Sequence, residues 1–288
     1  MDDYIKAGKI AKEAKEYAKS LIKPGINLLE LADNIENFIK TNGGEIAFPV
    51  NLSLNEIAAH HVPAWNETLS LNQNDVLKID IGVHINGYIA DTAFTVSFNP
   101  ENHNLIKASK EALENAIKLI KPGITLAEIG DVVQKTISSY GYQPIINLAG
   151  HSLDKYDLHA GMSIPNFNNK NKTTLEEGMV LAIEPFATSG KGLVTETTIK
   201  EVFRLVKSGP TRYKNILVHI EKNYNALPFA KRWLVKKFGP LKTQLAIREL
   251  VSKGILHEYK ELKEVSNGLV SQHEHTIIVK KDKAKVTT

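Results

Sequence analysis

Five side chains, spread over most of the sequence, have the types and contexts of metal ligands: Asp80, Asp91, His151, Glu184 and Glu274. Four carboxylates and one imidazole make a hard, oxygen-rich ligand set. Such a set suits two divalent ions that activate water, rather than an electron-transfer centre. The chain has no cysteine, which excludes thiolate metal sites and cysteine nucleophiles. The sequence therefore predicts a dinuclear metal centre in a hydrolase.

A predicted β-hairpin positions the first two of these ligands. Asn86 and Gly87 separate two runs rich in β-branched and aromatic residues, which is a strong signal for a two-residue turn. With this turn, Asp91 falls opposite Gly82, and Asp80 lies on the same face of the sheet as Gly82. Both carboxylates would then point toward a shared ion, and Gly82 would leave empty space beside them. A register slip of one residue would separate the two carboxylates.

The two glutamates lie at the edges of apolar runs. Glu184 ends the run 179–183 and is followed by Pro185, and Glu274 precedes the run 276–279. A carboxylate in a buried strand needs a cation or a proton. For any single acid, a salt bridge or a strand position that faces solvent is an equal alternative. Because all four acids lie in such strand contexts, we expect metal ligation.

An internal repeat indicates how the chain is organised around these ligands. The segment Leu21–Glu30 recurs almost unchanged as Leu119–Glu128, and each copy follows an amphipathic helix, at about 5–22 and 102–120. In each copy Pro-Gly ends the first helix, and an Asn or Thr followed by Glu three residues later predicts a capping box for the next. Lys-Pro-Gly could also be only a common helix stop. The length of the match favours two related α/β halves with a site between them.

A basic segment separates Glu184 from Glu274. From residue 228 to residue 263 there are nine Lys or Arg and three Glu. Helices are predicted at 232–238 and 243–256, and the pattern resembles a small winged-helix insertion. A basic face of this kind, formed by residues such as Lys231, Arg232, Lys236 and Lys237, would suit contact with nucleic acid or a ribosome. An ordinary solvated face on a helical insertion is the more frequent meaning of such a pattern.

Bulk composition is that of a globular protein. The chain has 288 residues, 42% of them hydrophobic and 24% charged, with a formal net charge of +4. It has no signal-peptide pattern and no apolar run of about 18 residues. We therefore expect a cytoplasmic protein without membrane contact. The mild positive charge does not by itself predict nucleic-acid binding.

Taken in order, these motifs resemble those of type II methionine aminopeptidases of the archaeal kind, over essentially the whole chain. The resemblance implies an α+β pita-bread fold with a pseudo-two-fold internal repeat. It also implies that Asp91 and Glu274 bridge two ions, that Asp80 completes one site, and that His151 and Glu184 complete the other. The native metal is left open among Co, Mn, Fe and Zn.

Three features point to type II. Phe48–His60 resembles the segment that carries a substrate-side histidine, Leu158–Gly161 resembles the segment with a second one, and the basic insertion resembles the helical subdomain of that type. The implied domains are a catalytic domain at 1–199 and 264–288, and a helical insertion subdomain at 200–263.

The resemblance also implies individual roles. His60 would contact the substrate amide or leaving nitrogen, and His159 would stabilise the developing oxyanion. Glu184 is a candidate proton acceptor as well as a ligand. Three residues would lie beside the methionine side chain: Phe48, Leu158 and Tyr259.

The implied function is hydrolytic removal of the N-terminal methionine from nascent proteins and peptides, with a preference for a small second residue. The expected partners are peptide and nascent-chain N-termini, and a ribosome through the basic insertion, with the enzyme a monomer. An X-Pro dipeptidase or aminopeptidase P would use the same ligands with a different pocket. A non-catalytic relative that binds RNA or ribosomes would keep the fold, but such relatives lose metal ligands, and all five are present here.

Overall fold

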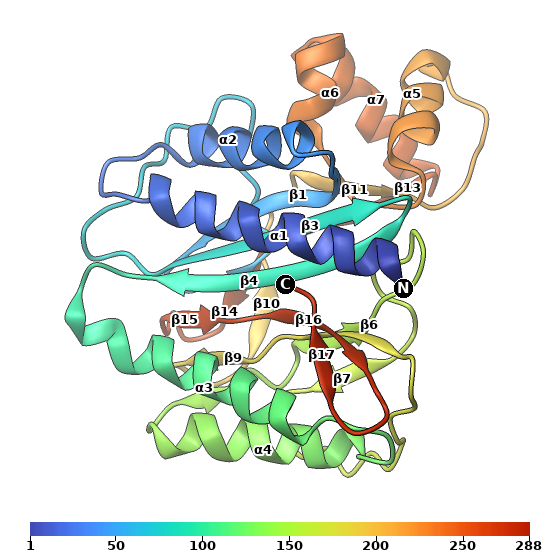
Figure 1. The fold of residues 1–288 in the computed structure, drawn as a ribbon. Coiled ribbons are helices and arrows are strands. Elements are labelled where there is room, and N and C mark those ends of the chain that lie inside the picture. The colour runs from blue at the N-terminus through green and yellow to red at the C-terminus, as the bar shows by residue number, and fades with distance from the viewer.

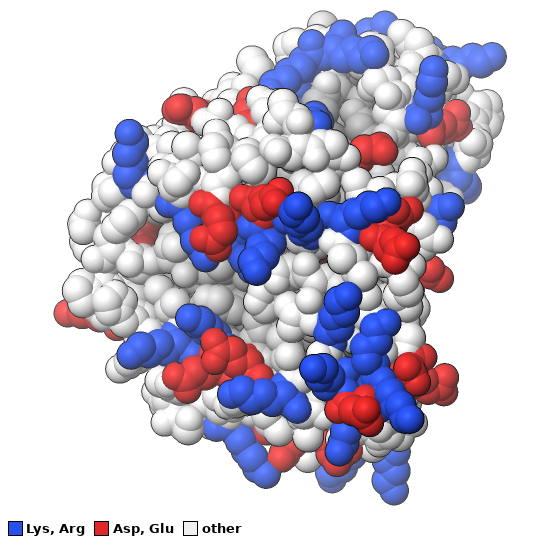
Figure 2. Space-filling model, in the orientation of Figure 1, with Lys and Arg blue, Asp and Glu red and all other residues white.

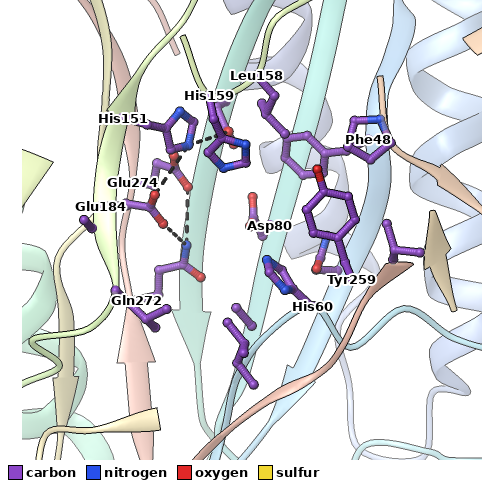
Figure 3. A pocket seen from close by; sticks show the side chains of 18 of the residues that line it. Phe48, His60, Asp80, His151, Leu158, His159, Glu184, Tyr259, Gln272 and Glu274 are labelled. Carbon is purple, nitrogen blue, oxygen red and sulfur yellow. Dashed lines mark hydrogen bonds and ion pairs between the residues drawn. The ribbon is translucent and has the colours of Figure 1, made fainter. Parts of the chain in front are cut away.

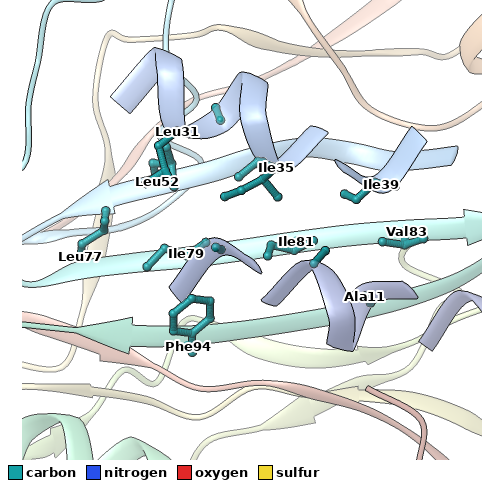
Figure 4. Close-up of a cluster of buried hydrophobic side chains, with 14 of the residues drawn as sticks. Ala11, Leu31, Ile35, Ile39, Leu52, Leu77, Ile79, Ile81, Val83 and Phe94 are labelled. Carbon is teal, nitrogen blue, oxygen red and sulfur yellow. The ribbon is translucent and has the colours of Figure 1, made fainter. Parts of the chain in front are cut away.

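The computed structural model describes residues 1–288, and its N-terminal half is a sheet covered on one face by two helices (Figure 1). Its elements are α1 (Asp2–Leu21), α2 (Leu28–Thr41), β1 (Glu45–Leu54), β2 (Ile57–Ala59), β3 (Leu77–Ile85) and β4 (Tyr88–Val96). The strands pair in the order β1-β3-β4. Ala7, Ala11, Ala14 and Ala18 form a fully buried stripe that lets α1 lie close to the strands. Figure 4 shows the aliphatic side chains of α2 meeting those of β1 and β3 in this core.

The second half repeats this plan with its own helix pair. Its elements are η1 (Pro100–Asn102), α3 (His103–Leu119), α4 (Leu126–Ser139), β5 (Gln143–Pro144), β6 (Ala149–Ser152), β7 (Ser163–Pro165), β8 (Val180–Ile183), β9 (Phe186–Thr188), β10 (Val194–Glu196), β14 (Leu262–Glu264), β15 (Val270–Gln272), β16 (His275–Val279) and β17 (Ala284–Val286). The main sheet has the order β17-β16-β8-β6-β7. A second buried cluster joins α3 and α4 to these strands. The strands of both halves therefore lie between two outer helix pairs (Figure 1).

The repeated segments start α2 and α4 as expected, but only one forms a full capping box. The Asn27 side chain accepts a hydrogen bond from the Glu30 amide at 3.1 Å. At the second copy Thr125 accepts from the Glu128 amide at 3.2 Å, and the Glu128 carboxylate accepts from the Thr125 amide at 2.8 Å. The predicted helix starts are confirmed, and the reciprocal box is confirmed for the second copy alone.

The predicted hairpin has the predicted register. Asn86 and Gly87 have φ of +53° and +88°, which fits a primed two-residue turn between β3 and β4. Gly82 pairs with Asp91 across the hairpin. Asp80 and Asp91 therefore lie on one face, as the turn residues predicted.

Residues 202–259 form a compact unit with its own core at the edge of the molecule (Figure 1). Its elements are β11 (Val202–Leu205), α5 (Lys214–Tyr224), β12 (Phe229–Ala230), α6 (Lys231–Phe238), α7 (Pro240–Ser252) and β13 (Leu256–Tyr259). The three short strands pair in the order β12-β11-β13, which with the helices gives a winged-helix-like arrangement. The expected helix at 243–256 begins earlier, at Pro240, and ends at Ser252.

Arg232 is not part of an exposed basic face, so that prediction is wrong. Its side chain is 0% exposed and forms an ion pair with Glu36 of α2, which is also buried. The same carboxylate accepts from Trp233 Nε1 at 2.8 Å and from the Val50 amide at 3.2 Å. This buried ion pair therefore connects the unit to the N-terminal half.

Two of the other predicted face residues are also paired. Lys231 Nζ lies 3.0 Å from Glu201, and Lys236 Nζ lies 2.7 Å from Asp33. Lys237 and Lys242 are the exposed lysines that remain on α6 and α7 without a carboxylate partner. Separately, none of the helices has the length and apolar content needed to cross a membrane.

Candidate metal centre

The five predicted ligands line one cavity of about 210 Å³ between the two halves (Figure 3). Asp80 and Asp91 come from β3 and β4, and His151 comes from β6. Glu184 directly follows β8, and Glu274 lies between β15 and β16. Pairing of β16 with β8 brings His275 opposite Ile183, so the backbone next to each glutamate is fixed by the same ladder.

The distances among these side chains suit ions rather than direct pairing. His151 Nε2 lies 3.4 Å from Glu184 Oε1 and 3.8 Å from Asp91 Oδ2. Asp91, His151 and Glu274 each offer one ligand atom, and these atoms lie within 4.8 Å of one another. A shared ion can sit among atoms at this spacing.

The buried carboxylates of the cavity would be stabilised by positive charge. Burial raises the pKa of Asp80 to about 7. Burial and then repulsion from the neighbouring carboxylates raise the pKa of Asp91, Glu184 and Glu274 well above their ordinary values. No lysine or arginine forms an ion pair with any of these acids. Ionising these buried carboxylates is therefore unfavourable, and only bound protons or cations can remove that cost.

Unpaired carboxylate oxygen atoms also indicate that the cavity holds cations. Asp80 Oδ1, Asp91 Oδ1 and Glu274 Oε1 are buried and have no hydrogen-bond partner in the protein. Unpaired buried carboxylate oxygens are rare in folded proteins because each loses its hydration without replacement. The residues present therefore fit a pair of divalent ions.

Gln272 is a site residue that sequence reasoning missed. Its side-chain amide donates to Glu184 Oε2 and to Glu274 Oε2, both at 3.3 Å, and the residue is 1% exposed. It therefore orients two glutamates at once, as outer-shell residues of metal sites do. The available signal was its position two residues before Glu274, which places both side chains on one face of an extended segment.

His60 and His159 both line the cavity, as expected. The ring centroid of His159 lies 4.4 Å from that of His151, and burial lowers the pKa of His159. His60 Nδ1 lies 3.1 Å from the Lys260 carbonyl oxygen, which can only accept, so Nδ1 carries the proton. Burial lowers the pKa of His60, so its Nε2 is a neutral acceptor.

The backbone conformation of His60 is also unusual. His60 has φ of +65°, in the left-handed region that non-glycine residues rarely occupy. Its neighbour His61 lies outside the cavity lining and bonds Glu261 at 2.8 Å. Strained backbone of this kind persists where surrounding contacts hold it, often at functional sites.

The apolar end of the cavity contains the three expected residues. Figure 3 shows Phe48, Leu158 and Tyr259 on the side opposite His151, Glu184 and Glu274. The expectation of empty space at Gly82 is wrong, because a Cβ atom there would overlap the ring of Phe48. Gly82 therefore makes room for an aromatic wall of the pocket rather than for an ion.

Comparison with known proteins decides the family. The sequence profile of metallopeptidase family M24 matches residues 2–225. This chain belongs to metallopeptidase family M24. A methionine aminopeptidase of Thermococcus onnurineus is 47% identical and covers 99% of this chain and 98% of the relative. One of Pyrococcus abyssi is 48% identical, with 100% and 99% covered. The resemblance to archaeal type II methionine aminopeptidases is confirmed.

Solved structures of the M24 fold agree with the architecture. The methionine aminopeptidase from Rickettsia prowazekii superimposes with a TM-score of 0.73 at 21% identity, covering 99% of this chain and 95% of that one. A thermophilic Arx1 gives 0.83 at 16% identity, covering 99% and 89%. The prolidase from Pyrococcus furiosus gives 0.65 at 20% identity, and only 63% of that chain is covered. The predicted α+β pita-bread fold is confirmed.

Proposed function

We propose that this M24 protein is a metal-dependent exopeptidase that removes the N-terminal methionine from peptides and nascent proteins. The observation that carries the proposal is the match to archaeal methionine aminopeptidases over 98–99% of their length. The Pyrococcus furiosus prolidase is 20% identical, a likeness that extends to the fold alone, whereas the methionine aminopeptidases are 47–48% identical. All five candidate ligands line one cavity, which argues against a non-catalytic relative.

The ligand assignment remains as the family resemblance implies it. Asp91 and Glu274 would lie between two divalent ions, with Asp80 on one side and His151 and Glu184 on the other. When bound, such ions lower the pKa of a water molecule and polarise a carbonyl. The ion could be Co, Mn, Fe or Zn, since the O/N ligand set accepts each of them.

The protein's own side chains would do the rest of the chemistry. Glu184, held by Gln272, can accept the proton released by the attacking water. His159 lies beside His151 and can donate to the carbonyl oxygen as charge develops on it. Because Nε2 of His60 is an acceptor, it can hold the N–H of the scissile amide and orient the first peptide bond.

The apolar end of the cavity suits a methionine side chain. Phe48, Leu158 and Tyr259 offer aromatic and aliphatic surface, and an unbranched thioether adapts to such a slot. Tyr259 comes from β13, so we propose that the insertion subdomain at 200–263 shapes substrate choice as well as packing on the domain formed by 1–199 and 264–288. The preference for a small second residue is part of this proposal and rests on the family resemblance.

A peptide panel tests the specificity. Met-Ala-Ser should be cleaved to free methionine, and acetyl-Met-Ala-Ser should not, because its blocked amine cannot be bound among the carboxylates. Met-Trp-Ser should be a poor substrate, and Gly-Pro and X-Pro peptides should remain intact. Products can be separated by mass spectrometry on metal-loaded protein. Cleavage restricted to X-Pro bonds would replace this proposal with the prolidase alternative.

Ribosome contact through the insertion is a separate proposal. Fewer of the basic residues named from the sequence are available to support it. Of the residues named for that face, Arg232 is buried, and Lys231 and Lys236 are paired with acids. The proposal now rests on Lys237 and Lys242, beside the exposed Leu241.

A further inference from the structure

A second cavity of about 360 Å³, which we call the α1–α3 cavity, lies behind the strand segment that carries Glu274. His273 and His275 line it, whereas Glu274 lines the metal cavity, because adjacent side chains of an extended segment point to opposite faces. Lys15 and Lys19 of α1 and Lys110 of α3 complete its basic lining, with Glu114 as its one acid. Figure 2 shows lysines of both helices on either side of a hollow on this face.

Lys15 is the unusual residue of this cavity. It is 8% exposed, and its Nζ has one hydrogen-bond partner, Thr92 Oγ1 at 3.1 Å. An ammonium group has three N–H donors, and no carboxylate forms an ion pair with this one. Burial, and then repulsion from Lys19, lowers the pKa of Lys15 to about 8. A buried ammonium without a paired counter-ion is costly, so a bound anion would stabilise Lys15.

The other basic groups have free donor positions that face the same space. His273 Nδ1 lies 2.8 Å from Ser109 Oγ, and His275 Nδ1 lies 2.7 Å from Thr288 Oγ1. The Nε2 atom of each ring has no partner within the protein, and it can donate in the tautomer whose Nδ1 accepts from the serine or threonine hydroxyl. Lys110 is exposed and has no ion-pair partner, while Lys19 is paired with Glu16 at 2.7 Å.

We propose that the α1–α3 cavity binds an oxyanion of the phosphate class. The anion would accept from Lys15, from Lys110 and from the two histidine rings, which supplies the negative charge that Lys15 lacks. A volume of about 360 Å³ admits an inorganic phosphate or the phosphoryl group of a small phosphoester. Thr92 donates to the Glu274 carbonyl oxygen at 2.9 Å, so this site contacts the backbone of the metal centre from behind.

Binding of inorganic phosphate by isothermal titration calorimetry tests the site, with metal-loaded and chelator-treated protein compared so that phosphate bound to the ions is recognised. We expect saturable binding in both forms. Lys15→Gln and Lys110→Gln should each weaken it about tenfold, the loss of one charge-assisted hydrogen bond. Lys118→Gln, on α3 like Lys110 but outside the cavity, should not change phosphate binding. Lys110 is exposed, so its variant remains informative if Lys15→Gln fails to fold.

AMP distinguishes the sources of the phosphoryl group. If AMP binds more tightly than inorganic phosphate, the site is assigned to a phosphoester. If inorganic phosphate binds more tightly, the site is assigned to the free anion. No binding at millimolar phosphate, or equal binding by wild type, Lys15→Gln and Lys110→Gln, would overturn the proposal. Weaker metal binding in Lys15→Gln with no phosphate bound by wild type would also overturn it and assign Lys15 to the metal centre alone. The readout is binding, so failure leaves the peptidase proposal unaffected.

Discussion

Glu274→Gln is expected to lower kcat/KM for release of methionine from Met-Ala-Ser by on the order of 10³-fold or more, above the 10- to 100-fold typical of outer-shell residues. The substitution keeps the shape of the side chain and removes one charge from the proposed bridging position. Gln272 would lose one of its two carboxylate partners. The measurement is initial rate against peptide concentration on protein loaded with metal at saturating concentration.

The same variant should be more stable than wild type when both are metal-free. Burial and the neighbouring acids raise the pKa of Glu274, so its ionised form is unfavourable in the folded chain at neutral pH, and a neutral amide removes that cost. Metal should then stabilise the variant less than it stabilises wild type. Thermal melts with and without metal measure both effects.

Glu264→Gln is a matched control that should lose stability and keep activity, the opposite of what is expected for Glu274→Gln. Glu264 is 1% exposed, but its carboxylate accepts from the Gly268 amide at 2.9 Å and from Ser266 Oγ at 2.7 Å. Burial raises its pKa, and these hydrogen bonds outweigh that effect and lower it. Neutralising it should reduce stability and leave kcat close to wild type. A Glu274→Gln enzyme with wild-type activity would rule out the bridging role.

Glu36→Ala is expected to lower the free energy of unfolding by about 3–5 kcal/mol. Arg232 is 0% exposed, and removal of Glu36 takes away its buried partner and leaves only the partly exposed Asp33, whose Oδ1 lies 3.6 Å from Nε. Trp233 Nε1 and the Val50 amide lose an acceptor as well. Urea denaturation followed by tryptophan fluorescence and by circular dichroism measures the change.

Two further variants show whether the buried charge is the cause. Asp131→Ala breaks an exposed pair with Lys135 and should cost at most about 1 kcal/mol. Arg232→Met combined with Glu36→Leu should recover much of the stability lost in Glu36→Ala, because no unpaired charge remains in the core. An equal loss in Glu36→Ala and Asp131→Ala would contradict the role given to this pair.

The parts of the site that the sequence predicted are those set by local chemistry. Asn86 and Gly87 fix the turn, the turn fixes the register, and the register places Asp80 and Asp91 on one face. Carboxylates in apolar strands stand out because burial without a cation is unfavourable. The helix starts at Asn27 and Thr125 follow from side chains that bond the backbone within one turn.

The predictions that failed, and the residue that was missed, depend on contacts between distant segments. Gly82 left space for an aromatic ring, but nothing in the hairpin indicates that Phe48 of β1 would fill it. Arg232 lies in a basic run, and only the packing of α6 on α2 buries it against Glu36. Gln272 acquires its role from Glu184, which follows β8 and is distant from Gln272 in the sequence.

The most direct test of the central claim is a metal titration of chelator-treated protein, with bound metal per chain and methionine released from Met-Ala-Ser measured on the same samples. We expect no activity without metal, recovery as ions bind, and saturation at two ions per chain. Asp91→Ala should fail to reach that stoichiometry. Full activity in protein verified to be free of metal would contradict a metal-dependent hydrolase built on Asp80, Asp91, His151, Glu184 and Glu274.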